Sequence, residues 1–282
     1  MLAFVQNAAA DYSRKTLDVS HTRARRRILG HPIIILSPAG ALPLSGWLET
    51  IIRSTWGLLY LCPIVILFGR DGNQETNMGV LLRMVTATTL SRASADLWSH
   101  TDAIHGCLTL LTATFKKTPN LIVSHHNHIA PLFHLGVEAL KLPEEGTVRG
   151  AGHFLASFIN LSRDPNGGCL QPVVAHNSET LVRTLMFCIC NSPRHSLTSF
   201  SDVLSALCKM YGDDLARTFK TVQADETFLS PRVNAQQKDD FAKKVLKNRG
   251  SKRRILEAVT DLALIGRGLA GTDYGAQTRG FH

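Results

Sequence analysis

The sequence predicts an all-α protein in which antiparallel helix pairs stack side by side as an α-solenoid. Three observations predict it. Apolar residues recur at helical spacing from about residue 75 onward, proline-marked turns separate these helical faces, and no useful stretch alternates as a half-buried strand would. At 44% hydrophobic and 19% charged residues, the chain can build a sizeable core. We therefore expect residues 75–282 to form one solenoid domain.

The apolar faces can be followed helix by helix along this part of the chain. Within each face the apolar residues are mostly three or four positions apart, so that they lie on one side of a helix. In chain order the faces are Ile104/Leu108/Leu111/Phe115, Ile129/Phe133/Gly136/Leu140, Val148/Ala151/Leu155/Phe158, Leu181/Leu185/Cys188, Leu197/Phe200/Leu204/Leu207, Phe241/Val245 and Ile255/Val259/Leu262.

The turns between the faces are also regular. Pro143, followed by two glutamates, predicts a helix start, because proline fits the first helical position and acids favour the positive end of the helix dipole. Asn234 and Gln237 have the spacing of a capping box. Alternate helices then begin near residues 100, 143, 193 and 234, at intervals of 43, 50 and 41 residues. These intervals approach the roughly 40–47 residues of two-helix HEAT-type repeats.

Residues 1–74 have a different character. Pro32, Pro38 and Pro43 interrupt each apolar run there, so we expect an atypical, poorly ordered segment. Within it, Ser54–Gly69 is uncharged, but as a helix it would span only about 24 Å of the roughly 30 Å hydrocarbon core, and Pro63 interrupts it. A membrane-associated adaptor using residues 54–69 is therefore an alternative that the sequence does not favour.

The positive charge is concentrated near one end. The net charge is +9, and residues 238–254 hold eight Lys/Arg against two Asp, a net +6. We expect a solvated basic patch on the last helices that contacts acidic protein surface. The candidate protein-binding residues are Lys243, Lys244, Lys247, Arg249, Lys252, Arg253 and Arg254. No aromatic residues interleave with them as base-stacking platforms, so a nucleic-acid-binding module built on residues 238–254 is the second alternative.

The sequence offers no catalytic, metal or cofactor site. The six cysteines form no C-x-x-C pair, which favours free, buried thiols in a reducing compartment. His125–His128, with His134 beyond, is the one dense histidine cluster, and it lacks the further ligands that zinc needs; we interpret it as a polar helix start. The glycines Gly266, Gly268 and Gly271 follow a helix, so they are expected to end it and not to cradle phosphate. We expect no enzyme.

Several longer stretches resemble the importin-β (karyopherin) superfamily of nuclear transport receptors. The most specific lie in the tail "RVNAQQKDDFAKKVLKNRGSKRRILEAVTDLALIGRGLAGTDYG", Arg232–Gly275, above all its helix start "SKRR" and its closing "RGLAGTDY". Two further stretches, "FKKTPNL" and "LFHLGVEALKLPEEGTV", resemble a helix, turn and helix of the same family, and "FSDVLSALCKMY" resembles another of its helices. The resemblance is collinear over residues 78–274, and residues 1–74 take no part in it.

This resemblance implies a C-terminal HEAT-repeat fragment of a nuclear transport receptor that shuttles between nucleus and cytoplasm. It implies protein cargo, nucleoporins and GTP-bound Ran as partners. In the family the Ran site lies mainly on N-terminal repeats, which we expect this fragment to lack. No specific nucleic acid, membrane or cofactor is implied.

Overall fold

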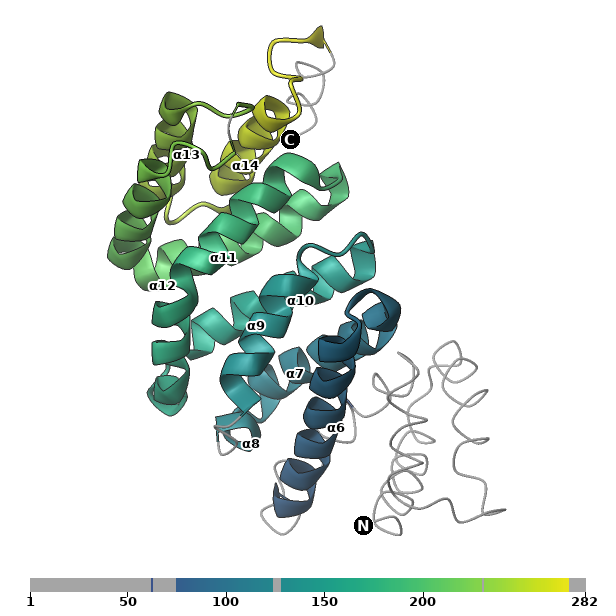
Figure 1. Ribbon diagram of the computed structural model, residues 1–282. Helices are drawn as coiled ribbons and strands as arrows, with labels where there is room; N and C mark the ends of the chain where they lie inside the picture. Colours follow the sequence, from purple (N-terminus) through teal and green to yellow (C-terminus); the bar gives the residue numbers. More distant parts are fainter. Residues whose placement is uncertain (1–61, 63–74, 124–127, 230, 274–282) are drawn as a thin grey trace, which may run out of the picture.

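The computed structural model describes residue 62 and residues 75–123, 128–229 and 231–273 (Figure 1). Its helices are α6 (Glu75–Ala95), α7 (Thr101–Lys117), α8 (Asn120–Val123), α9 (Ile129–Ala139), α10 (Glu145–Leu161), α11 (Gln171–Asn191), α12 (Leu197–Ala224), α13 (Ala235–Lys247) and α14 (Lys252–Gly266). Short 3₁₀ turns, η1 (Trp98–His100), η3 (Pro165–Leu170) and η4 (Arg194–Ser196), lie between them. Over these ranges there is no strand, so the predicted all-α class is confirmed.

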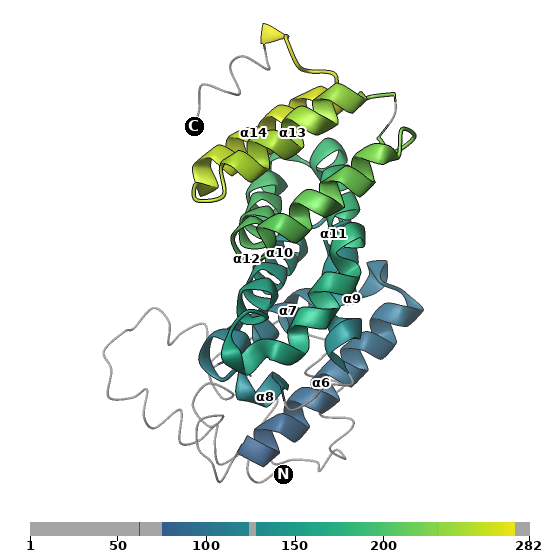
Figure 2. The ribbon, with the colours of Figure 1, turned by 90° about the vertical axis from the view of Figure 1, so that its left-hand side faces the viewer.

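The helices stack in one direction from α6 to α14 (Figures 1 and 2). Helix α10 packs between α7 and α12, and α11 packs between α9 and α14. Consecutive helices such as α9 and α10, or α13 and α14, contact each other across short turns. This arrangement is the stacked-pair solenoid that the spacing predicts, because each pair covers the apolar stripe of the next.

The predicted apolar faces form the core. Every residue of those faces is buried, from Ile104 in α7 to Leu262 in α14. Four phenylalanines pack together where α7, α9 and α10 meet: Phe133 and Phe158 have ring centroids 5.0 Å apart, and Phe115 lies 5.6 Å from Phe154. The periodicity therefore identified the buried side of each helix correctly.

The predicted helix ends are also confirmed near the C-terminus. Asn234 Oδ1 accepts from the Gln237 amide at 2.8 Å, and Gln237 Oε1 accepts from the Asn234 amide at 2.9 Å, which is a complete capping box. Helix α14 ends in a Schellman motif: Gly268 has φ +69°, and the Leu269 amide donates to Leu264 O at 2.8 Å. Gly268 is needed there because other residues rarely adopt a positive φ.

Two expected boundaries are wrong. Helix α10 begins at Glu145, with the extended Glu144 as its N-cap, so Pro143 lies before the helix and not in its first turn. Helix α12 begins at Leu197 after a 3₁₀ turn, because the extended Pro193 (ψ 158°) precedes η4. Helix α12 also has non-helical dihedrals at Tyr211 (φ −134°, ψ 36°), so its two halves differ in direction. The repeat spacing did not indicate this kink.

Some expectations concern residues that the structure describes little or not at all. Residues 1–61 and 63–74 lie outside the described ranges, and so does the apolar segment Ser54–Gly69 apart from Cys62. Among the helices that are described, none combines the length and the apolar character needed to cross a bilayer. The cysteines are free thiols as expected, and four of them, Cys107, Cys188, Cys190 and Cys208, are buried.

His105 of α7 supplies a pH-dependent element in the packing of α7 on α10. Its Nδ1 is buried with no hydrogen-bond partner, and it faces Gly150 closely. Burial lowers the pKa of His105, and the charge of Arg149 adds to this, against the opposing effects of a backbone hydrogen bond with Gly146 and of Asp102.

The stability of the protein is therefore expected to fall as the pH falls below about 6.5, where the unfolded state takes up a proton at this residue more readily than the folded state. We expect His105→Gln to flatten the decrease of the thermal unfolding midpoint between pH 7.5 and 5.5. Equal slopes for the two proteins would contradict this role. His176→Gln, on α11, is the control for the loss of an imidazole.

Candidate functional site

The basic patch is carried by α13 and α14, and the local sequence explains its orientation. Phe241, Ala242 and Val245 are buried on one side of α13, which turns Lys243, Lys244 and Lys247 to solvent. At the start of α14, Ser251 Oγ accepts from the Arg254 amide at 3.4 Å. This N-cap sets the beginning of the helix, and it places the cations at 252–254 in the exposed first turn.

Three of the predicted site residues form ion pairs that join different helices. Lys244 Nζ lies 2.8 Å from Asp261 Oδ2 of α14, and Lys252 Nζ lies 2.7 Å from Asp202 Oδ1 of α12. Arg249 Nη2 lies 3.3 Å from Asp213 Oδ1, just after the kink of α12, and its guanidinium covers Gly212. The pairing suits a structural role: Lys244 ties α13 to α14, and Arg249 and Lys252 tie this last helix pair to α12.

The other four predicted site residues are more available. Lys243 and Arg253 pair only within their own helices, with Asp239 at 2.5 Å and Glu257 at 3.2 Å. Arg254 contacts the amide oxygen of Asn248 at 3.5 Å, and Lys247 makes no ion pair with any residue that the structure describes. Because exposed same-helix pairs are worth only a few tenths of a kcal/mol, a partner can displace them.

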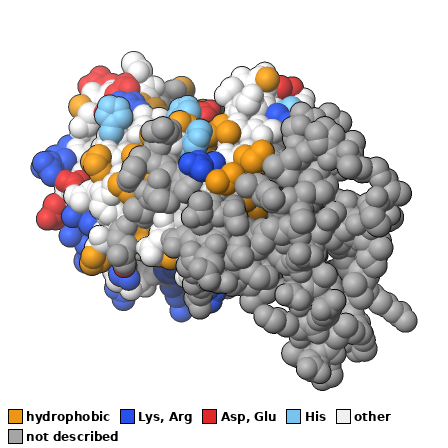
Figure 3. Space-filling view, turned by 90° about the horizontal axis from the view of Figure 1, so that it is seen from below, with side chains coloured by type: hydrophobic (Ala, Val, Ile, Leu, Met, Phe, Trp, Pro, Cys, Tyr) orange, Lys and Arg blue, Asp and Glu red, His pale blue; other side chains and the backbone are white. Residues whose placement is uncertain are grey.

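Lys238 belongs to the basic run but not to the surface. It is 1% exposed, its Nζ donates to the Asp225 carbonyl oxygen at 3.0 Å, and it lies 5.8 Å from the centre of the Phe228 ring. The count of charges in the sequence therefore overstates the positive charge that this end of the molecule presents. Figure 3 shows a different face, seen from below in the orientation of Figure 1 and therefore away from α13 and α14; on its described part, cationic and acidic side chains are interspersed.

A second polar region, which the sequence did not indicate, lies between α11 and the second half of α12. An open cavity of about 410 Å³ is lined there by apolar residues such as Val182 and Leu215 and by polar ones such as Ser178 and Thr218. Tyr211, at the kink, also lines it; its hydroxyl lies 2.6 Å from Ser162 Oγ, and the Arg163 guanidinium lies 4.3 Å from its ring centre. No motif marks these residues, because they come from separate helices.

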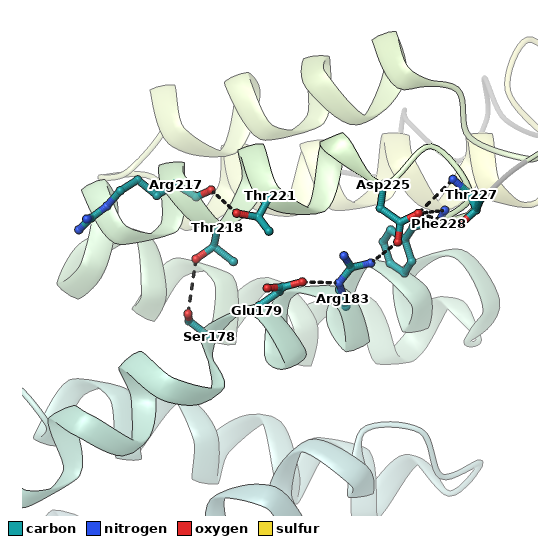
Figure 4. Close-up of polar contacts among 9 residues, drawn as sticks. All are labelled: Ser178, Glu179, Arg183, Arg217, Thr218, Thr221, Asp225, Thr227 and Phe228. Carbon is teal, nitrogen blue, oxygen red and sulfur yellow. Dashed lines mark hydrogen bonds and ion pairs between the residues drawn. The ribbon is translucent and has the colours of Figure 1, made fainter.

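A polar network that includes Glu179, one of the residues that line this cavity, connects α11 to the end of α12 (Figure 4). Arg183 donates to Glu179 on α11 and to Asp225 in the α12–α13 connection, both at 2.8 Å, and its guanidinium lies over the Phe228 ring. A hydrogen bond from the Thr227 hydroxyl and the bond from Arg183 lower the pKa of Asp225 to about 2. The network joins α11 to the segment leading into α13, which is a structural function.

The structure brings together no metal-binding group among the residues it describes. No three His, Cys, Asp or Glu side chains there converge on a metal position. His128 is the N-cap of α9, as expected of a polar helix start, while His125 and His126 lie outside the described ranges. Burial raises the pKa of Cys107 to about 12 and that of Cys188 to about 11, which keeps both thiols protonated and unreactive.

The comparisons with known proteins agree with this geometry. Residues 140–215 match the family model of the importin 13 repeat. The chain is 30% identical over 217 residues to importin-13 of Gallus gallus and 29% identical over 214 residues to that of Homo sapiens, in each case covering 76% of this chain and 22% of the relative. The resemblance to importin-13 is thereby confirmed, and the chain spans about a fifth of the length of these relatives.

The solved structure of importin-13 in its cytosolic state is similar as well. It superposes with a TM-score of 0.70 over 85% of this chain and 27% of that one, at 20% identity. At that identity the likeness shows the fold alone, and that fold is the predicted helical solenoid.

Proposed function

We propose that this chain is part of an importin-13-like nuclear transport receptor and that it works by binding proteins. The observation that carries the proposal is the 30% identity to importin-13 along 76% of the chain, together with the stacked helix pairs. Protein cargo and nucleoporins are the proposed partners of this chain, GTP-bound Ran is a proposed partner of the whole receptor, and nucleus and cytoplasm are the proposed locations. No enzymatic step is proposed, because the relatives that the chain matches are importins.

Shuttling tests this function. We expect the chain, fused to a fluorescent protein and expressed in one cell of a heterokaryon, to reach the second nucleus when protein synthesis is blocked. The same fluorescent protein alone, enlarged to prevent passive diffusion, is the control. Retention of the fusion in the donor nucleus or exclusion from both nuclei would contradict the proposal.

Within this function, we propose that the available cations of the basic patch contact acidic protein surface. The triple variant Lys247→Ala/Arg253→Ala/Arg254→Ala removes charge without breaking an ion pair between helices. Its stability should change by no more than about ±0.5 kcal/mol per position, as is usual for surface substitutions. We expect the amount of acidic protein that co-purifies with the chain from cytosol, quantified by mass spectrometry, to fall several-fold.

The matched comparison is Lys244→Ala/Arg249→Ala/Lys252→Ala, which removes the same charge but cuts the pairs to Asp261, Asp213 and Asp202. We expect this variant to lower the unfolding midpoint, whereas the first variant should not. If the first variant keeps its protein partners but loses binding to an RNA or DNA oligonucleotide, the patch is a nucleic-acid site and the proposal is wrong.

A further inference from the structure

An open groove crosses the helices on the side of the stack formed by α7, α10 and α12. Its volume is about 410 Å³, and it reaches the first residue of α14. Three lysines and a histidine border it, each from a different helix: Lys116 of α7, His153 of α10, Lys209 of α12 and Lys252 of α14. Helices that are far apart in the sequence therefore place basic side chains around one groove.

The charge of this groove is not balanced by its own lining. Among the described residues that border this hollow, Asp202 is the one acidic side chain, and its carboxylate is already paired with Lys252. Lys116 and Lys209 are exposed, and neither forms an ion pair with a residue that the structure describes. His153 is exposed beside them. The groove therefore has two lysines whose charges are available to a ligand.

The floor of the groove suits a peptide backbone. Between the lysines lie Ser157, Asn160 and Ser205, which supply hydroxyl and amide groups, and the small side chains of Ala156 and Ala206. Asn160 uses its amide nitrogen on the Ala156 carbonyl at 2.8 Å, which leaves its side-chain oxygen to accept from a ligand. A second hollow of about 300 Å³ shares Lys116, Ser157 and Asn160, so the groove continues along α7 and α10 as far as Asp164, which borders only this second hollow.

We propose that this groove binds an extended acidic segment of a partner protein. Three neighbouring helices at about 8–10 Å spacing span about 20 Å, the length of about six extended residues. Carboxylates at the two ends of such a segment would reach Lys116 on α7 and Lys209 on α12, while the backbone between them lies over the serines and Asn160.

The composition of the groove favours protein over nucleic acid. No arginine borders the groove in the part of the chain that is described. None of the described side chains around its main hollow, the one that Lys116 and Lys209 border, is aromatic. Arginine forks and stacking platforms are what phosphate and base recognition use most. The exposed large apolar residues among those described, Trp98 and Phe187, lie elsewhere.

The proposal goes beyond the transport function, and it concerns a surface other than the basic patch, with which it shares only Lys252. It also does not depend on shuttling. A chain that shuttles but does not bind acidic peptides would refute the groove alone, and the reverse result would refute the transport function alone.

Fluorescence anisotropy with a labelled eight-residue peptide of alternating Glu and Ser tests the groove directly on the full chain. We expect saturable binding that weakens as salt is raised, and at least tenfold weaker binding by Lys116→Ser/Lys209→Ser. The matched control is Lys141→Ser/Lys220→Ser, which removes two exposed lysines outside both the groove and the basic patch and should leave the affinity within about twofold. Circular dichroism unfolding curves of all three proteins establish that each is folded.

Four results would overturn the proposal. They are no binding of the peptide, an equal loss in the control and groove variants, equal binding of a peptide with Gln in place of Glu, or tighter groove-dependent binding of an RNA oligonucleotide of the same charge. The second would show that net charge alone attracts the peptide, and the last would make the groove a nucleic-acid site.

Discussion

Replacing Phe158 with alanine is expected to lower the free energy of unfolding by about 3–5 kcal/mol, the usual range for a buried phenylalanine. Phe158 is 1% exposed, and its ring meets Phe133 at 5.0 Å, Phe115 at 5.7 Å and Phe154 at 5.9 Å between centroids. Removing it leaves a cavity bordered by three aromatic rings from α7, α9 and α10. These rings are held by helix backbones and can close the space only in part.

Equilibrium unfolding in urea, followed by circular dichroism at 222 nm, measures this change. Phe187→Ala is the matched control, because Phe187 is also helical but 50% exposed, and its loss should cost much less. If the two substitutions lower the stability by the same amount, the aromatic cluster is not the centre of the core.

Replacing Gly152 with a larger residue is expected to push helices α10 and α12 apart. A Cβ atom at Gly152 would lie 2.9 Å from the Ser199 Cβ and 3.1 Å from its carbonyl oxygen. Because part of that contact is with backbone, it cannot be relieved by turning a side chain. Gly152→Leu should therefore destabilise the protein by about 1–3 kcal/mol or more, as overpacking of an interior contact does.

The change also has a structural readout. Weaker contact between α10 and α12 should speed hydrogen exchange of the amides in both helices more than in α7, and mass spectrometry of peptic fragments can measure it. Gly168→Leu is the control, since a Cβ at Gly168 meets nothing within 4 Å. A Gly152→Leu protein as stable as the Gly168→Leu protein would show that the two helices can move apart freely.

The sequence by itself determined which residues of each helix are buried. An apolar residue at every third or fourth position defines one side of a helix whatever lies opposite, so Ile104 in α7 and Val245 in α13 could both be assigned to the core. Caps are equally local: the Asn234–Gln237 box and the positive φ of Gly268 involve residues a few positions apart. These predictions needed no knowledge of how the helices pack.

The helix boundaries at Pro143 and Pro193 could be located only to within a few residues. A proline near a turn can be the first helical residue or can precede the cap, and both positions tolerate the missing amide. The kink at Tyr211 has no local signal either. The Tyr211 side chain contacts Ser162 and Arg163 at the end of α10, and these residues are distant from it in the sequence.

Only the tertiary structure decided which cations are available to a partner. By composition the eight lysines and arginines of residues 238–254 are equivalent, yet Lys238 is buried and Lys252 is paired with α12 while Lys247 extends into solvent. The groove bordered by Lys116 and Lys209 likewise depends on four helices. The physical reason is that burial follows from the periodicity within one helix, whereas ion pairs and grooves depend on how far neighbouring helices are shifted and rotated against each other.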